Sequence, residues 1–142
     1  MLRIISKVLY VFASLLFVGT LVAYAQAQAS ALDGARNLII QTIGAEKDTV
    51  AIVATEKVVT VERINSNMNG SSHSARNNEA SAIGPIVVQA IADKPEFKGI
   101  LVIRVQYLRR VSQSAKVVQS SKVVDTIEYR KDASGKFQFH ET

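Results

Sequence analysis

The clearest hydrophobic pattern in the chain runs from Lys98 to Ser112 and predicts a central β-strand. Side chains alternate between the two faces of a strand. One face of this stretch carries only apolar and aromatic side chains, namely Leu101, Ile103, Val105 and Tyr107. The other face is apolar near Gly99 and becomes polar at Arg104 and Gln106. We therefore predict a strand that is buried at one end and reaches solvent at the other.

Further strands are predicted wherever Val, Ile, Thr and aromatic residues are enriched, because these side chains fit a pleated sheet. Such stretches are Thr49–Ile64, Val117–Lys131 and Lys136–Thr142. Asp132–Gly135 predicts a hairpin turn between the last two, since glycine adopts a positive φ easily. Glu56 and Lys57 form a poor hairpin turn, because neither residue adopts a positive φ easily. The pattern therefore slightly favours one long or bulged strand over two strands in Thr49–Ile64.

A first helix is predicted over Ser30–Ile43, where apolar residues recur every three or four positions. Ser30 and Asp33 match a capping box at its start. Gly44 stands where a helix would stop, because a left-handed glycine commonly ends one.

A second helix is predicted over Glu79–Asp93. Proline fits best in the first turn of a helix, so Pro85 places the start of its regular part near Gly84. The preceding segment, Asn65–Asn78, is dominated by Asn, Ser and Gly and has one large apolar side chain, Met68. We expect this segment to be a surface loop, either a binding loop or a disordered one.

The order of these elements predicts an α+β fold. We expect a small antiparallel sheet of about four strands, ending in a C-terminal β-meander, with two helices packed on one face. The other face is expected to be wet, because its predicted side chains are polar: Arg104, Gln106, Thr126, Glu128, Arg130 and Gln138.

Residues 1–29 have the features of a signal peptide. Arg3 and Lys7 give a positive start, and the uncharged apolar run Val8–Ala25 follows. Small residues at alternate positions allow cleavage after Ala25, Ala27 or Ala29. An uncleaved membrane anchor is the alternative, because the run is just long enough to span a bilayer. We therefore predict an exported protein, periplasmic or secreted, with a single α+β domain over residues 30–142.

Charge and cysteine content narrow the function. The 142-residue chain has a formal net charge of +5, and removing Arg3 and Lys7 leaves 15 basic and 12 acidic residues. This small excess allows attraction to an anionic envelope component, but it is too weak to predict specific nucleic-acid binding. The chain has no cysteine, which excludes a disulfide scaffold, thiol catalysis and thiolate metal sites.

The candidate catalytic residues are weak. Histidine is the most common general base and metal ligand, and the chain has two, His73 and His140. Neither belongs to a recognisable motif, so an enzyme would need both to meet Glu79 in the fold. No cofactor or metal is predicted.

The candidate binding residues are four arginines near the central strand: Arg104, Arg109, Arg110 and Arg130. Guanidinium groups on neighbouring strands can hold a phosphate or carboxylate, but they can equally pair with Glu128 across the sheet. The sequence thus predicts an exported, non-enzymatic binding domain. Its partner would be an unknown envelope protein or an anionic envelope component, with membrane contact only through an uncleaved signal segment. A small metal-dependent or hydrolase-like enzyme that uses the two histidines is the alternative.

Overall fold

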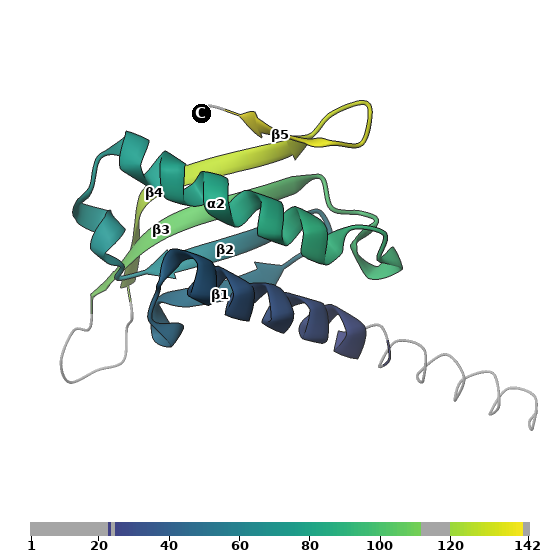
Figure 1. Cartoon of the computed structure of the whole chain (residues 1–142), viewed down its shortest axis with the longest axis horizontal. Coiled ribbons are helices and arrows are strands. Elements are labelled where there is room, and N and C mark those ends of the chain that lie inside the picture. The colour runs from purple at the N-terminus through teal and green to yellow at the C-terminus, as the bar shows by residue number, and fades with distance from the viewer. Residues whose placement is uncertain (1–22, 24, 112–119, 141–142) are drawn as a thin grey trace, which may run out of the picture.

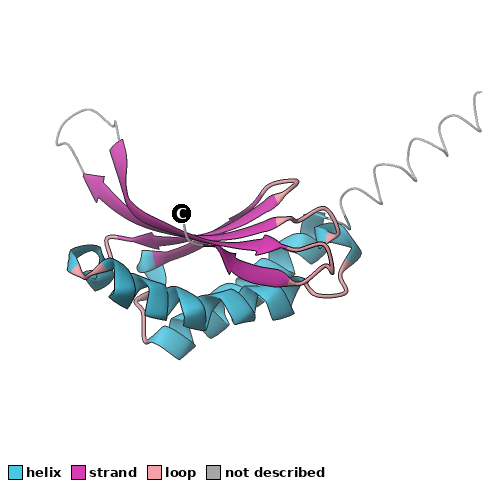
Figure 2. Ribbon diagram, turned by 90° about the horizontal axis from the view of Figure 1, so that it is seen from above, coloured by secondary structure: helices cyan, strands magenta, loops and turns pink. Residues whose placement is uncertain are grey.

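The computed structural model describes residues 23, 25–111 and 120–140, and within them the chain forms a five-stranded sheet with two helices on one face (Figures 1 and 2). The predicted α+β class and the placement of both helices on one face are confirmed. The strands are β1 (Val50–Ala54), β2 (Val58–Ile64), β3 (Val102–Val111), β4 (Ser120–Lys131) and β5 (Phe137–His140), in that spatial order. Most of the predicted signal peptide lies outside the described residues.

The sheet is mixed, which corrects the predicted antiparallel sheet of about four strands. β2 and β3 are parallel, and the other neighbours are antiparallel. A parallel pair needs a long crossover, and the helix α2 (His73–Ile91) supplies it. β3, β4 and β5 form the predicted C-terminal meander, and the predicted turn before β5 is confirmed, with Gly135 at φ 84°.

Thr49–Ile64 forms two strands, so the preference for a single strand was wrong. Thr55 closes the turn between β1 and β2: its amide donates to the Val58 carbonyl at 2.8 Å, and its hydroxyl accepts from the Val58 amide at 3.2 Å. Because the hydroxyl takes this amide, the turn forms without a positive φ at Glu56 or Lys57.

The N-terminal helix covers residues 25–43 in the described part of the chain. Gly44 ends it with a φ of 63°, as predicted. The predicted capping box is wrong, because the helix continues upstream of Ser30, which is therefore not its first residue. Among the described residues, no helix combines the length and apolarity needed to cross a membrane.

Helix α2 begins at His73, six residues before the predicted start, so the last part of the predicted loop is helical. Ser72 caps it by accepting the Ala75 amide at 3.2 Å. Pro85 lies inside the helix and its side chain faces solvent, so the start predicted near Gly84 was also wrong. The rest of the predicted loop contains a short 3-10 helix, η2 (Asn67–Gly70).

The core lies between the helices and the sheet. Strand register puts the fully buried side chains of Val59, Ile103 and Ile127 on the helix-covered face. Two more 3-10 helices are short: η1 (Lys47–Thr49) precedes β1, and η3 (Pro95–Phe97) follows α2. Phe97 of η3 enters the same core. As predicted, the opposite face of β3 carries Arg104 and Gln106.

Candidate functional site

The structure does not bring the three candidate catalytic residues together. His73 and Glu79 belong to α2, on the helix-covered side of the sheet. His140 lies opposite Glu128 in the register of β4 and β5, on the uncovered side. Within residues 25–110 and 120–140, no three His, Asp or Glu side chains are grouped so that they could hold a metal ion.

Glu79 forms a nearly buried ion pair with Arg63 of β2. The Arg63 Nε lies 2.8 Å from Glu79 Oε1, and the two side chains are only 3% and 12% exposed. A second guanidinium nitrogen of Arg63 donates to Thr49 Oγ1 at 3.0 Å. Arg63 points toward the helices because β2 places it beside Tyr107, on the buried face of the sheet.

A second polar group joins the first turns of α2 to β4. Asp125 Oδ2 accepts from Arg76 Nε at 2.6 Å and lies 2.8 Å from His73 Nδ1. Between the two groups, the Tyr107 hydroxyl donates to the Arg76 carbonyl at 2.9 Å. The first turns of α2 therefore carry polar side chains on their sheet-facing side, and polar groups of β3 and β4 satisfy their hydrogen bonds.

Two pKa shifts keep this network in fixed protonation states. Burial raises the pKa of the Tyr107 phenol, and the negative charge of Glu79 raises it further, so Tyr107 remains a donor. Burial also raises the pKa of the Asp125 carboxyl, but hydrogen bonds from Arg76 and His73 outweigh burial and leave this pKa below its usual value. Asp125 is therefore charged at neutral pH.

The His73–Asp125 pair could orient a general base, but the hydroxyls of the two serines that precede His73 make other contacts. Ser72 uses its hydroxyl to cap α2, and the Ser71 hydroxyl contacts the sulfur of Met68 at 3.8 Å. The pair joins helix α2 to strand β4.

Three of the four candidate binding arginines form ion pairs within the protein. Arg104 and Arg130 both contact the buried carboxylate of Glu128, at 2.7 and 2.9 Å. Arg110 contacts Glu62 at 3.3 Å, and Arg109 is exposed. Arg104–Glu128 is the cross-strand pair that the sequence offered as the alternative to an anion site, whereas Arg130 reaches Glu128 along the same strand, β4.

Hydrogen bonds from both arginines outweigh the effect of burial and lower the pKa of Glu128. Its carboxylate therefore holds two of the four candidate binding guanidinium groups.

A polar cavity of about 400 Å³ borders the Arg63–Glu79 pair. It lies below the end of the N-terminal helix and is also lined by Thr49 and Ser66. The Ser66 hydroxyl is buried and has no hydrogen-bond partner among the residues that the structure describes. Because a serine hydroxyl is readily satisfied by water, this cavity has the chemistry of a water site.

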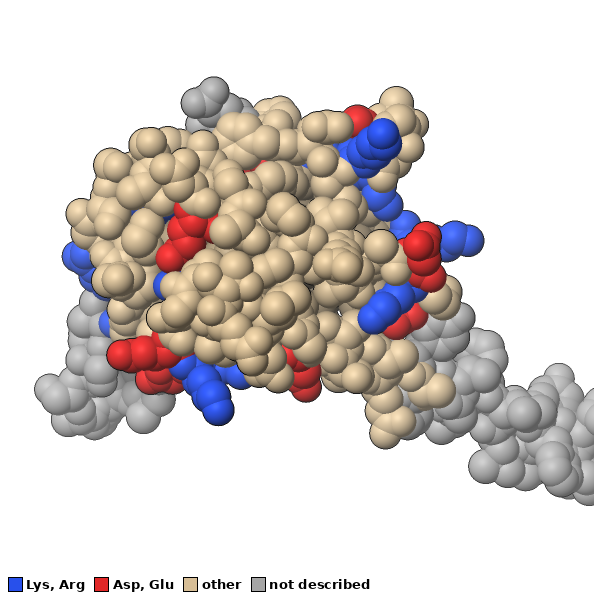
Figure 3. All heavy atoms as spheres, in the orientation of Figure 1, with Lys and Arg blue, Asp and Glu red and all other residues tan. Residues whose placement is uncertain are grey.

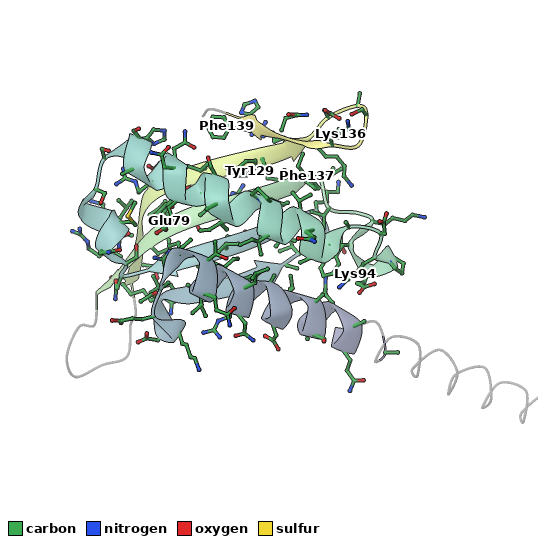
Figure 4. All side chains as sticks on the ribbon, in the orientation of Figure 1. Glu79, Lys94, Tyr129, Lys136, Phe137 and Phe139 are labelled. Carbon is green, nitrogen blue, oxygen red and sulfur yellow. The ribbon has the colours of Figure 1, made fainter. Side chains whose placement is uncertain are left out.

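A larger cleft, of about 730 Å³, lies at the opposite end of α2. It opens between the end of α2, η3 and the turn that joins β4 to β5. Its apolar floor is formed by Val88, Ile91, Phe97 and Phe137. Figure 4 shows Lys94 beyond the end of α2, Lys136 on the β4–β5 turn, and Glu79 far from both along the helix.

Four lysines line this cleft, and none of them forms an ion pair among the described residues: Lys94, Lys98, Lys131 and Lys136. The Nζ atom of Lys131 lies 5.3 Å from the centre of the Phe137 ring, so this cation rests against the apolar floor. In Figure 3, blue side chains stand on both sides of a notch at the right of the molecule. One acidic residue, Asp93, also lines the cleft.

Sequence reasoning missed this cleft because its lysines come from two separate segments, Lys94–Lys98 and Lys131–Lys136. The only local signal was the short spacing of lysines around Pro95 and around Gly135. Folding brings the two pairs together, since η3 and the β4–β5 turn lie at the same end of α2.

Comparisons with known proteins add no family or function: no family model, no curated protein and no solved structure matches the chain.

Proposed function

We propose that this protein is a non-enzymatic binding domain that holds a small amphipathic anion in the lysine-lined cleft. The apolar part of the ligand would lie on the floor near Phe137, and its carboxylate, phosphate or sulfonate would lie among the lysines. As the N-terminal sequence predicts, we expect the domain to act after export. The observation that carries the proposal is the meeting, over an apolar floor, of four lysines that form no ion pair with any described residue.

Charge supports an anion as the ligand. The four lysines and Asp93 give the cleft lining a net charge of +3. The end of α2 contributes the negative end of the helix dipole, equivalent to about −0.5 of a charge. Lysines near the C-terminal end of a helix often do no more than offset the helix dipole. Here the net positive charge of the lining is several times larger than the partial charge of the dipole. The remaining positive charge is available to a ligand.

The floor supports an amphipathic ligand over a simple ion. Ligand sites are typically concave and mainly apolar, with a few polar groups that fix orientation. Phe97 is almost fully buried, while Phe137 is half-buried and reaches the cleft. A hydrophobic tail laid over Phe137 would remove further apolar surface from water, at about 25 cal/mol per Å².

The test compares dodecanoate with dodecyl maltoside, which has the same tail and an uncharged head. Binding is measured by calorimetry below the micellar concentration of each. We expect dodecanoate to bind more tightly, and the K94Q/K136Q variant to show a smaller preference, because Lys98 and Lys131 remain. Two exposed ion pairs are worth about 0.4–2 kcal/mol, so the variant should bind dodecanoate roughly 2- to 30-fold more weakly.

The matched control is K57Q/K122Q, which removes two exposed lysines that do not line the cleft. It should bind dodecanoate as the native protein does. Equal affinity for the two ligands, or equal loss in both double variants, would contradict the proposal.

A further inference from the structure

Strand β1 lies at one edge of the sheet and pairs only with β2 among the described strands (Figure 1). Its five residues, Val50–Ala54, are all uncharged and apolar. Natural edge strands are usually protected from pairing by charges, proline or a bulge. The side chain of Val53, on the face without helices, is 50% exposed. β1 therefore lacks the usual protection.

The hydrogen-bond phase of β1 shows which backbone groups face outward. Thr55 and Val58 face each other as a hydrogen-bonded pair of the antiparallel ladder, because the Thr55 amide donates to the Val58 carbonyl. Pairs alternate along an antiparallel ladder, so Ile52 and Ala54 direct their amides and carbonyls away from β2. Val50 belongs to the same set, and its outward carbonyl accepts from Arg36 Nε at 2.7 Å.

Two residues thus remain open at this edge. Among the described residues, no side chain or loop bonds the outward groups of Ile52 or Ala54, which leaves two amides and two carbonyls available. Arg36 occupies the Val50 carbonyl and so limits pairing at that end of the strand.

We propose that β1 pairs with β1 of a second copy of this chain, antiparallel and about a two-fold axis at Val53. This register places Ile52 opposite Ala54 of the other copy, in both directions. The two open amides and two open carbonyls of one chain then pair with those of the other chain. The dimer gains four hydrogen bonds in total, and no open group is left without a partner. A register centred on Ile52 would need the Val50 carbonyl, which Arg36 already holds.

The side chains fit the same register. The two Val53 side chains meet directly across the axis, in a non-hydrogen-bonded pair with its Cα atoms about 4.5 Å apart. No charged residue of one β1 faces a charged residue of the other, although the whole chain is positive. The opposite edge, β5, is a poorer choice because Lys131 and Lys136 lie beside it and would repel a second copy. The dimer surface is separate from the lysine-lined cleft.

The first test is the mass of the purified protein by sedimentation, over about 10 µM to about 1 mM. The native protein should shift from monomer to dimer across this range. Val53→Lys places two lysines opposite each other and should raise the dissociation constant at least about tenfold. Val123→Lys is the control, because Val123 is 49% exposed on a strand distant from β1.

A mixture of Val53→Lys and Val53→Glu chains should recover the dimer, because opposite charges then meet at the axis. This rescue separates lost pairing from lost folding. A native protein that stays monomeric throughout the range, or a dimer that Val53→Lys does not weaken, overturns the proposal.

A cross-link tests the register itself. The chain has no cysteine, so Val53→Cys introduces a single thiol. Two such thiols at the axis meet the distance needed for a disulfide, and mild oxidation should link the dimer. Ala51→Cys is the control on the same strand and face, since its two copies would lie about 13 Å apart. Equal cross-linking of both variants would refute the register centred on Val53.

Discussion

Breaking the Arg63–Glu79 ion pair should destabilise the protein strongly. Glu79→Gln keeps the size of the side chain and removes its charge. The Arg63 guanidinium, 3% exposed, then remains charged and buried beside a neutral amide. Leaving one member of a buried pair uncompensated costs about 3–5 kcal/mol. For a domain with a free energy of unfolding of about 5–15 kcal/mol, this is a large fraction.

The cost can be measured by urea unfolding followed by circular dichroism. With an m-value of about 1.5 kcal/mol/M, a loss of ~3 kcal/mol lowers the urea midpoint by about 2 M. The matched control is Glu62→Gln, which breaks the Arg110–Glu62 pair. Those side chains are 39% and 22% exposed, so this loss should stay below about 1 kcal/mol.

Replacing both partners separates the value of the pair from the cost of a lone charge. In Arg63→Met/Glu79→Leu no buried charge remains, and apolar substitutes for a buried pair are often neutral. Because the Thr49 groups lose their donor, we expect a cost of about 2 kcal/mol or less, below that of Glu79→Gln. If Glu79→Gln costs no more than Glu62→Gln, the argument from burial is wrong.

Two further predictions concern backbone space and pH. Gly84→Ala should destabilise the protein by about 1 kcal/mol in urea unfolding, because a Cβ there would lie 2.9 Å from the Tyr129 ring. At Gly34 an added Cβ meets no neighbour, so Gly34→Ala should stabilise the protein by up to about 1 kcal/mol in the same assay. Burial raises the pKa of Asp125, but the hydrogen bond from Arg76 outweighs burial and leaves the folded-state pKa lowered. The stability that the Asp125 carboxylate contributes is therefore fully present above the unfolded pKa of about 3.9, and it is lost as pH falls through the folded value. Urea midpoints measured from pH 6 down to pH 2 should therefore fall less steeply for Asp125→Asn than for the native protein, and an unchanged slope would contradict the assignment.

The faces of the strands could be predicted from the sequence because alternation depends on local geometry alone. The apolar face of β3, including Ile103 and Val105, is the face that the helices cover. The β1–β2 turn could not be predicted in the same way. It depends on the Thr55 hydroxyl in place of a positive φ, and general turn preferences do not include this substitution.

The start of α2 was missed because its first turns do not look like a buried helix. Hydrophobic periodicity assumes that a buried face is apolar, but Arg76 and Glu79 are largely buried against Asp125 and Arg63. Each of these residues looks like a solvent-facing residue until its partner is known. The partners lie 16 and 49 positions away in the chain, beyond the range of local patterns.

The two halves of α2 also explain why a polar end and the lysine-lined cleft belong to one helix. The second half packs on the sheet through apolar side chains such as Val87 and Ile91. Apolar contacts are non-directional, so they tolerate a shift along the sheet. The first half does not, because any shift would leave Arg63 or Asp125 buried without its partner. Pairing at one end of the helix therefore fixes where the other end lies, and with it the position of Lys94 over the cleft floor.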